Sequence, residues 1–287
     1  MIKIISYIIF KILNFIDKVF KFITKKSFLV WFKEFIHDTS YINIIINNKE
    51  VKFFTPNLLT EYRVMSFYSK EPETLEWIDK FKDKKNSIFW DIGSNIGLFS
   101  IYNTLKNKNF TTISFEPSTS NLRVLSRNIF INKFENKIKI FPIPLSKKKN
   151  SFLMMNEGNF MEGGALNSFG ESFNFEGKKF KSNMKYQTIG TSINYLLENK
   201  ILEIPDYIKI DVDGNEHLIL EGADKFLGNK KIKSLSIEIN ENFSKQYKTV
   251  IKIMKKNNFK ILNKNHAQKN IDKKSKFYKS FNYIFIR

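Results

Sequence analysis

A run of acid, glycine and amide residues follows an apolar stretch about one third of the way along the chain. In Ile88-Phe-Trp-Asp-Ile-Gly-Ser-Asn-Ile-Gly97, Asp91 stands at the end of a predicted buried strand, and Gly93, Asn95 and Gly97 stand in the turn that opens a helix. Glycine allows a sharp turn and the close approach of a ligand to the backbone. Because open α/β sheets bind ligands at the carboxyl ends of their strands, we expect this turn to line a binding site.

This turn differs from the glycine fingerprint that cradles a dinucleotide pyrophosphate. Asn95 stands where the middle glycine belongs, and Leu98 stands where the third glycine belongs. A cofactor without phosphates, whose cationic amino-acid moiety lies near Asp91, fits the run better, and S-adenosylmethionine has both properties. A tight strand-to-helix turn without a ligand is the alternative interpretation of this segment alone.

A second acid, Glu116, ends the next predicted strand in Thr112-Ile-Ser-Phe-Glu-Pro117. Nucleoside-binding sheets place a carboxylate at this point to accept hydrogen bonds from ribose hydroxyls. Taken alone, such a glutamate is most often a favourable charge at the start of a helix. Its spacing from the glycine turn favours the ribose-binding function.

A third strand, predicted over residues 207–212, also ends in acids. In a doubly wound sheet it lies next to the first strand, so Asp211 should face the same cleft as Asp91. We expect Asp211 or His217 to act as the general base, although a histidine in the following helix is more often structural. Asp213 is a candidate substrate-binding residue.

Two further features of these acids bear on ligands. Glu238 ends the predicted strand 234–239 and is a second candidate substrate-binding residue, with a plain strand-end carboxylate as the alternative. The string Asp211-Val-Asp-Gly-Asn-Glu216 superficially resembles a calcium loop, but it lacks the twelve-residue ligand pattern and the helix–loop–helix setting. We therefore predict no metal site.

The order of predicted elements favours an α/β fold. From residue 85 to residue 287 short strands alternate with helices of about ten residues, which is typical of a doubly wound, mostly parallel sheet. Residues 37–84 contain a predicted β-hairpin and two helices, over about 58–69 and 73–83, and a later helix is predicted over 216–227. The stretch 150–185 is rich in glycine, asparagine and aromatic residues. We expect it to form short strands and a lid over the molecule on which the protein acts.

The N-terminal stretch 1–36 has the pattern of a basic amphipathic helix. Polar residues recur every three to five positions, and apolar residues fill the broad remainder. Such a helix suits an anionic membrane surface, while packing on protein is the alternative. Its longest uncharged run is seven residues, Ile4–Phe10, so it is too short to span a bilayer, and a signal peptide is not expected.

The chain has 287 residues, no cysteine and a formal net charge of +20. The absence of cysteine excludes disulfides and thiolate metal sites, and it is compatible with the cytoplasm. The positive charge invites a nucleic-acid ligand, but only four of the 48 basic residues are arginine, and much of the excess lies at the two ends. We therefore do not expect nucleic acid as a partner.

Together these motifs resemble the FkbM family of S-adenosylmethionine-dependent methyltransferases. The resemblance spans about residues 85–265 and rests on the run 89–100, on Phe115-Glu-Pro117, on the run 209–216 with Leu220-Glu-Gly-Ala223, and on Ser236-Ile-Glu238. It implies a seven-stranded class I methyltransferase sheet with an antiparallel last strand. Family members typically carry glutamate where Asp213 stands, so the role of that position is less defined.

The resemblance also implies roles for the site residues. Asp91, Gly93, Asn95 and Gly97 would surround the methionine part of the cofactor, and Glu116 would bind its ribose. The acceptor would be a small molecule or a glycan, methylated on a hydroxyl. The expected location is the cytoplasm, with the surface of the cytoplasmic membrane as an alternative. A nicotinamide-dependent oxidoreductase and a non-catalytic membrane-binding or nucleic-acid-binding module are the alternatives.

Overall fold

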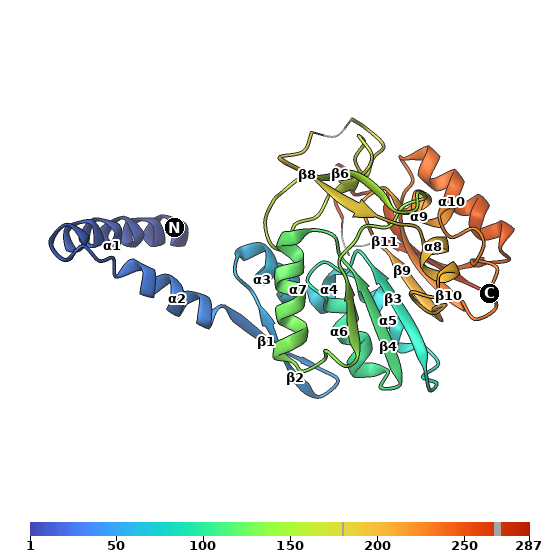
Figure 1. The fold of residues 1–287 in the computed structure, drawn as a ribbon, viewed down its shortest axis with the longest axis horizontal. Coiled ribbons are helices and arrows are strands. Elements are labelled where there is room, and N and C mark those ends of the chain that lie inside the picture. Colours follow the sequence, from blue (N-terminus) through green and yellow to red (C-terminus); the bar gives the residue numbers. More distant parts are fainter. Residues whose placement is uncertain (180, 267–270) are drawn as a thin grey trace. The chain divides into compact units, whose positions relative to one another are not determined.

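The computed structural model describes residues 1–179, 181–266 and 271–287. The chain separates into two compact units, Met1–Ile42 and Asn43–Arg287. Figure 1 shows the helices and strands of both.

The N-terminal unit contains helices α1 (Ile2–Thr24) and α2 (Leu29–Thr39). The sequence predicts one helical segment here, and the structure breaks it at Lys25, whose left-handed φ of 60° ends α1. The carboxylate of Asp17 accepts hydrogen bonds from the Ser27 hydroxyl at 2.8 Å and from the Phe28 backbone N–H at 2.8 Å. Asp17 thus binds free N–H groups at the start of α2 and fixes the turn. In the described parts of the chain, no helix is both long and apolar enough to cross a membrane.

A seven-stranded sheet forms the centre of the second unit, in the order β11-β12-β10-β9-β3-β4-β5. Its strands are β3 (Ser87–Ile92), β4 (Phe110–Phe115), β5 (Ile138–Phe141), β9 (Tyr207–Ile210), β10 (Ser234–Asn240), β11 (Lys260–His266) and β12 (Ser280–Ile286). Strand β12 is antiparallel to β10 and β11, whereas the pairs from β10 to β5 are parallel. Strands β3 and β9 are buried along their whole length, as parallel strands covered on both faces must be.

Helices cover both faces of this sheet (Figure 1). They are α5 (Pro72–Asp79), α6 (Leu98–Lys106), α7 (Thr119–Ile131), α8 (Ile193–Glu198), α9 (Glu216–Glu221) and α10 (Ser244–Lys256). On one face, Trp90 of β3 belongs to a core that includes Leu196 of α8 and Val250 of α10. On the other face, Phe89 packs edge-on against Trp77 of α5, with ring centroids 6.0 Å apart. The alternation of side chains along β3 therefore builds two cores.

A hairpin and two short helices precede the sheet. Strands β1 (Tyr41–Ile46) and β2 (Lys49–Phe54) are joined by Asn47 and Asn48, both of which have positive φ. Asparagine tolerates this conformation, which two-residue hairpins require. The predicted helix 58–69 is instead two helices, α3 (Leu58–Met65) and α4 (Phe67–Lys70), because Ser66 departs from helical geometry.

The stretch 150–185 forms a small sheet of its own at the carboxyl edge of the large one. Strands β6 (Ser151–Glu157) and β8 (Met184–Gly190) pair antiparallel, and β7 (Ser168–Phe169) pairs with the other side of β6. Residue 180 of this stretch lies outside the described residues.

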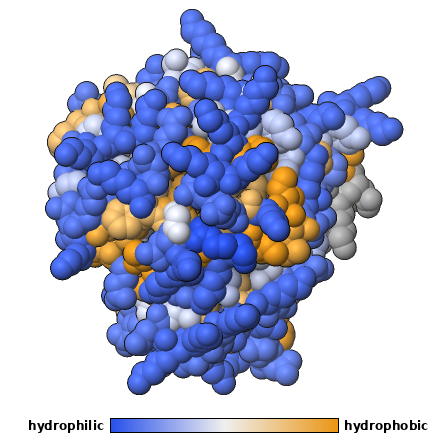
Figure 2. Space-filling view, turned by 90° about the vertical axis from the view of Figure 1, so that its right-hand side faces the viewer, coloured by the Kyte–Doolittle hydropathy of each residue, from blue (hydrophilic) through white to orange (hydrophobic). Residues whose placement is uncertain are grey.

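The doubly wound, mostly parallel fold predicted from the sequence is confirmed. The predicted helix 216–227 is shorter than expected and ends at Glu221. At the next position a Cβ atom on Gly222 would lie 2.3 Å from the Ser146 carbonyl oxygen, so a neighbouring segment passes too close for a larger residue. The face of the molecule at the right of Figure 1 is predominantly hydrophilic, with smaller hydrophobic areas between charged side chains (Figure 2).

Candidate active site

The glycine turn after β3 is packed directly against the strands beside it. The backbone N–H groups of Gly93 and Ser94 both donate to the Phe115 carbonyl at 3.0 Å. Gly93 has φ +84°, and a Cβ atom there would lie 1.8 Å from the carbonyl oxygen of Asp211. At Gly97, with φ +89°, a Cβ atom would lie 2.6 Å from Leu125 of α7. Both positions therefore require glycine for two reasons, backbone conformation and space.

Glu116 and Asn95 hold each other at the ends of β3 and β4. The Glu116 carboxylate accepts from the Asn95 backbone N–H at 2.7 Å and from the Ser118 backbone N–H at 2.9 Å. Burial raises the pKa of Glu116 to about 7, although these two hydrogen bonds oppose the shift. The Asn95 side-chain Oδ1 is buried without a hydrogen-bond partner among the described residues. The pair thus presents a carboxylate and a free amide acceptor.

A pocket that is partly open to solvent, which we call the Glu116 cavity, lies beside these residues. Its walls include Gly93, Asn95, Glu116, Asn121 and Phe169. Apolar side chains make up much of the remainder, a composition typical of small-molecule sites.

Asp91 does not line this cavity, although Gly93 and Asn95 do. Its side chain is fully buried, and its Oδ2 accepts from the Ser100 hydroxyl at 2.6 Å, while its Oδ1 has no partner in the described parts of the chain. Burial raises its pKa, although nearby Lys209 opposes the shift. The structure therefore places Asp91 one layer behind the turn, and Gly97 likewise packs against α7 rather than lining the cavity.

Lys209 is a buried cation that the sequence analysis did not single out. It lies opposite Asp91 in the β3–β9 register, its Nζ donates to Asp211 Oδ2 at 2.7 Å, and its side chain is only 3% exposed. Burial by itself would lower the pKa of Lys209, but the carboxylates of Asp211, Glu71 and Asp91 raise it above its ordinary value. The available signal was a lysine inside an otherwise apolar strand, two positions before Asp211 and hence on the same face.

Asp211 and Glu238 form a coupled pair of acids beside this lysine. Burial opposes ionisation of Asp211, but Lys209 and a hydrogen bond from Glu238 hold the pKa of Asp211 well below its ordinary value. Burial and the Asp211 charge raise the pKa of Glu238 well above its ordinary value. The two neighbouring acids therefore differ, because Asp211 favours its ionised form and Glu238 favours its protonated form.

Asp213 lies close to this pair in a different environment. It has a left-handed φ of 60°, and its Oδ2 accepts from the Leu166 backbone N–H at 2.6 Å. Burial and the charge of Asp211 raise the pKa of Asp213 to about 6. Glu216, which the sequence analysis left without a role, holds this turn because its carboxylate accepts from the backbone N–H groups of Val212 at 3.0 Å and Gly214 at 3.0 Å.

A second pocket, which we call the Glu238 cavity, is larger than the first and is lined by some of the same acids. Arg63, Lys70, Glu71, Tyr62 and Glu238 are among its walls. Five residues line both cavities: Gly93, Asn95, Ala165, Asp211 and Asp213. The two cavities therefore meet at the carboxylates of Asp211 and Asp213.

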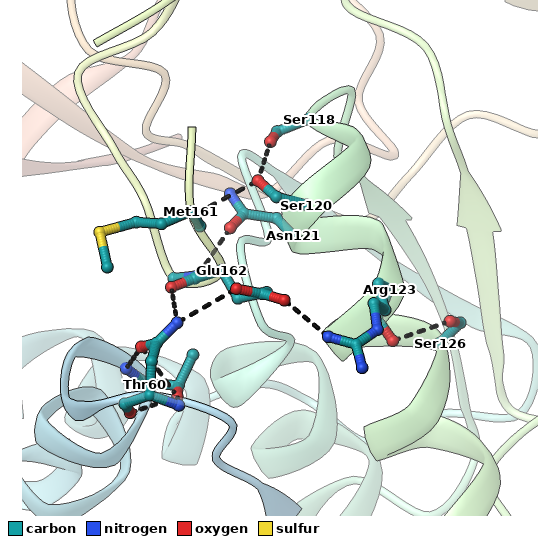
Figure 3. A network of polar contacts seen from close by, with 10 residues as sticks. Thr60, Ser118, Ser120, Asn121, Arg123, Ser126, Met161 and Glu162 are labelled. Atoms are coloured by element: carbon teal, nitrogen blue, oxygen red, sulfur yellow. Dashed lines mark hydrogen bonds and ion pairs between the residues drawn. The ribbon is translucent and has the colours of Figure 1, made fainter. Parts of the chain in front are cut away.

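Residues 159–166, which we call the 159–166 loop, are held over this junction by polar contacts from three parts of the fold. Asn95 Nδ2 donates to the Gly164 carbonyl at 2.7 Å, and Arg63 Nε donates to the Gly163 carbonyl at 2.6 Å. From α7, Asn121 accepts from the Gly163 N–H at 2.9 Å. Figure 3 shows the outer part of this network, in which Glu162 pairs with Arg123.

His217 is not brought to the junction. It is fully buried, lines neither cavity, and lies near the rings of Phe173 and Phe243. Neither ring nitrogen has a hydrogen-bond partner in the described parts of the chain, and burial lowers its pKa to about 4. The histidine is therefore neutral near pH 7 and separated from the acids. Among the described residues, no group of three or more His, Asp or Glu side chains could hold a metal ion.

Comparison with known proteins finds methyltransferases both by a family model and by sequence identity. Residues 91–261 match the family model described as the methyltransferase FkbM domain. The protein named methyltransferase sdnD of Sordaria araneosa is 28% identical over 200 residues, which cover 60% of this chain and 77% of that protein.

Two solved structures are similar in fold. The fibrillarin pre-rRNA processing protein of Methanococcus jannaschii has a TM-score of 0.44 and 14% identity, covering 86% of this chain and 82% of that chain. TrmK of M. capricolum, solved with S-adenosylhomocysteine, has a TM-score of 0.43 and 14% identity, covering 74% of this chain and 66% of that chain.

Proposed function

We propose that this chain, which belongs to the FkbM methyltransferase family and is an S-adenosylmethionine-dependent methyltransferase, methylates a hydroxyl oxygen of a glycan, a lipid-linked saccharide or a natural product. Family membership favours methyl transfer over the two alternatives that the sequence left open, which were an oxidoreductase and a non-catalytic module. The observation that carries the proposal is the meeting of the two cavities at Asp211 and Asp213.

The residues of the Glu116 cavity fit the cofactor. The unpartnered Oδ1 of Asn95 offers an acceptor for an amino group, and Gly93, which has no room for a Cβ atom against the Asp211 carbonyl, lines the cavity beside it. Glu116 would accept hydrogen bonds from the ribose hydroxyls. When bound, S-adenosylmethionine supplies an electrophilic methyl group on a positively charged sulfur.

The Glu238 cavity then takes the acceptor. Its walls carry cations, carboxylates, an amide and aromatic rings, among them Arg63, Asn159 and Tyr62. Such a lining can hydrogen-bond several hydroxyls while a ring packs on the face of a sugar. A polyhydroxylated molecule suits this cavity better than a purely apolar one.

The two carboxylates that line both cavities, Asp211 and Asp213, have different roles in the proposed reaction. Asp211 stays ionised but is a weak base because Lys209 and Glu238 stabilise its charge, so it orients the acceptor hydroxyl by accepting its hydrogen bond. Asp213, with a pKa of about 6, is closer to the value that a general base needs near neutral pH. The proton leaving the hydroxyl passes to Asp213 as the oxygen becomes methylated.

The proposed place of the reaction is the cytoplasm, at an anionic membrane surface. The support is the absence of cysteine and the basic, apolar character of the N-terminal unit. A lipid-linked saccharide would be reached most directly there.

Radiolabelled methyl transfer from S-adenosylmethionine to cell-envelope saccharide fractions tests the function, with O-methyl sugars identified by mass spectrometry. Asp211→Asn should bind S-adenosylhomocysteine normally but lose about 10²- to 10⁴-fold in turnover. In Asp213→Asn the acidic limb of the kcat/KM profile near pH 6 should disappear. Asp224→Asn, on an exposed turn, serves as the control.

Methylation of nitrogen in the same fractions would overturn the hydroxyl assignment. Full turnover by Asp211→Asn would remove Asp211 from the mechanism. If Asp211→Asn or Asp213→Asn failed to bind S-adenosylhomocysteine, the substituted residue would be needed for the folded structure rather than for the reaction.

A further inference from the structure

The N-terminal unit exposes most of its large apolar side chains. The exposed ones in α1 are between 42% and 79% exposed, and they recur at helical spacing along one side, as in Ile5, Ile9, Ile12, Ile16, Val19 and Ile23. In α2, Trp31 is 64% exposed and Phe35 is 62% exposed. Contiguous apolar surface of this kind marks an interaction site in a folded protein.

The opposite side of α1 carries the charge. Lys3, Lys11, Lys18, Lys21 and Lys25 form a stripe that runs from one end of the helix to the other. A helix with one apolar and one basic side along its whole length lies flat at an interface rather than crossing it.

The acidic side chains of the unit do little to offset these cations. Asp17 is the only buried residue of α1, and its carboxylate is occupied by the Ser27 hydroxyl and by the N–H groups of Phe28 and Leu29. Residues 1–42 otherwise contain two acids, Glu34 and Asp38, against seven lysines. Two copies of such a surface would repel each other, whereas an anionic lipid headgroup layer complements it.

We propose that residues 1–39 form a helical hairpin, folded on Asp17, that docks on an anionic lipid bilayer with its apolar side chains inserted and its lysines among the headgroups. This inference goes beyond methyl transfer, because lipid binding is measured without cofactor or acceptor. It also supplies a reason for a lipid-linked acceptor.

Tryptophan fluorescence of the full-length protein gives a direct readout. Of the three tryptophans, Trp77 and Trp90 are buried at 5% and 0% exposure, so Trp31 is the one whose surroundings lipid can change. Vesicles of equimolar phosphatidylcholine and phosphatidylglycerol should shift its emission to the blue. Phosphatidylcholine vesicles should have a much smaller effect, and Trp31→Phe should remove the shift while sedimentation with vesicles persists.

Matched lysine variants test the charge. K11Q/K18Q/K21Q should weaken binding to the anionic vesicles by about 100-fold, because each lysine near an anionic surface contributes roughly fivefold. The control, K252Q/K255Q/K256Q, removes the same charge from exposed positions of α10 in the core unit, which lies on the side of the molecule that Figure 2 faces. It should change binding by only a few-fold.

The apolar side is tested at constant charge by I8N/I12N/V19N, which should abolish the blue shift. Circular dichroism and S-adenosylhomocysteine binding establish that the core of each variant is folded.

Three outcomes would overturn the proposal. The first is an absence of vesicle binding by the wild-type protein. The second is an equal loss in the α10 control, which would assign binding to overall charge. The third is a concentration-dependent dimer that buries Trp31 without lipid, which would make a second copy the occupant. Loss of lipid binding with methyl transfer to a soluble acceptor intact would leave the proposed function standing.

Discussion

The Glu116 cavity and the Glu238 cavity meet at the same carboxylates but are built in different ways. The Glu116 cavity is shaped by backbone: the Gly93 turn is closed on Phe115, and Glu116 is held by the N–H groups of Asn95 and Ser118. The acids of the Glu238 cavity are instead held by side-chain charge, chiefly the buried Lys209. The Glu116 cavity therefore depends on the fixed shape of a turn, whereas the Glu238 cavity depends on side chains from segments far apart in the sequence, such as Arg63 and Glu238.

The charge-built side should be the more sensitive to loss of a single side chain. Lys209→Met leaves Asp211, Asp91 and Glu71 without their shared cation, so the free energy of unfolding should fall by about 3–5 kcal/mol. Lys233→Met is the matched control, because Lys233 also pairs with an aspartate, Asp206 at 2.6 Å, but is 31% exposed. It should cost about 1 kcal/mol or less.

Urea unfolding of both variants measures the difference. Equal losses in the free energy of unfolding would mean that burial does not distinguish the two ion pairs. The buried charge of Lys209 would then not be what holds the acids of the Glu238 cavity.

The backbone-built side should break when a single methyl group is added. Gly93→Ala forces a left-handed alanine against the Asp211 carbonyl, and we expect a loss of about 2–4 kcal/mol with loss of S-adenosylhomocysteine binding. Gly228→Ala is the control, since its nearest neighbour, Asn257 Oδ1, would lie at an ordinary 3.5 Å.

Calorimetric titration and thermal unfolding compare these two glycines. Normal cofactor binding by Gly93→Ala would show that the turn can relax, so that its shape is not what defines the cavity.

The smallest expected effect concerns the pH dependence of cofactor binding. Glu116 has a pKa raised to about 7, so it is mostly protonated at pH 6 and mostly ionised at pH 8. If the ribose binds the carboxylate, affinity for S-adenosylhomocysteine should rise about tenfold from pH 6 to pH 8.

Glu116→Gln should bind more weakly at pH 8 and lose this pH dependence. Glu198→Gln, an exposed partner of Lys225, should keep it. A pH slope that survives in Glu116→Gln would assign the titration to another group.

Much of the fold could be predicted from the sequence because its signals are local. Strands such as 87–92 are short apolar runs next to glycine turns, and helices such as α10 show a clear periodicity. The early end of α9 could not be predicted, since it depends on the segment around Ser146 that passes close to Gly222. The break at Ser66 was not predicted either.

The site residues predicted from the sequence fall into two groups, those that line a cavity and those that do not. Gly93, Asn95, Glu116, Asp211, Asp213 and Glu238 were predicted from strand ends, and all six line one or both cavities. Asp91 and His217 were predicted by the same reasoning, but the structure places both behind the surface. Position along the chain indicates that a residue is near the carboxyl edge, but not whether its side chain reaches a cavity.

The sequence alone therefore determined the family, the order of the strands whose carboxyl ends carry the acids, and the glycine turn that stands beside Glu116. These properties are encoded in short segments whose spacing fixes their place in the sheet. The tertiary structure alone decided that Lys209 lies against Asp211 and lowers its pKa, that the Asp211 charge raises the pKa of Glu238, and that Arg63 binds the 159–166 loop. Those contacts join residues that are far apart in the chain or depend on burial, and burial exists only once the sheet, the loop and the helices have packed together.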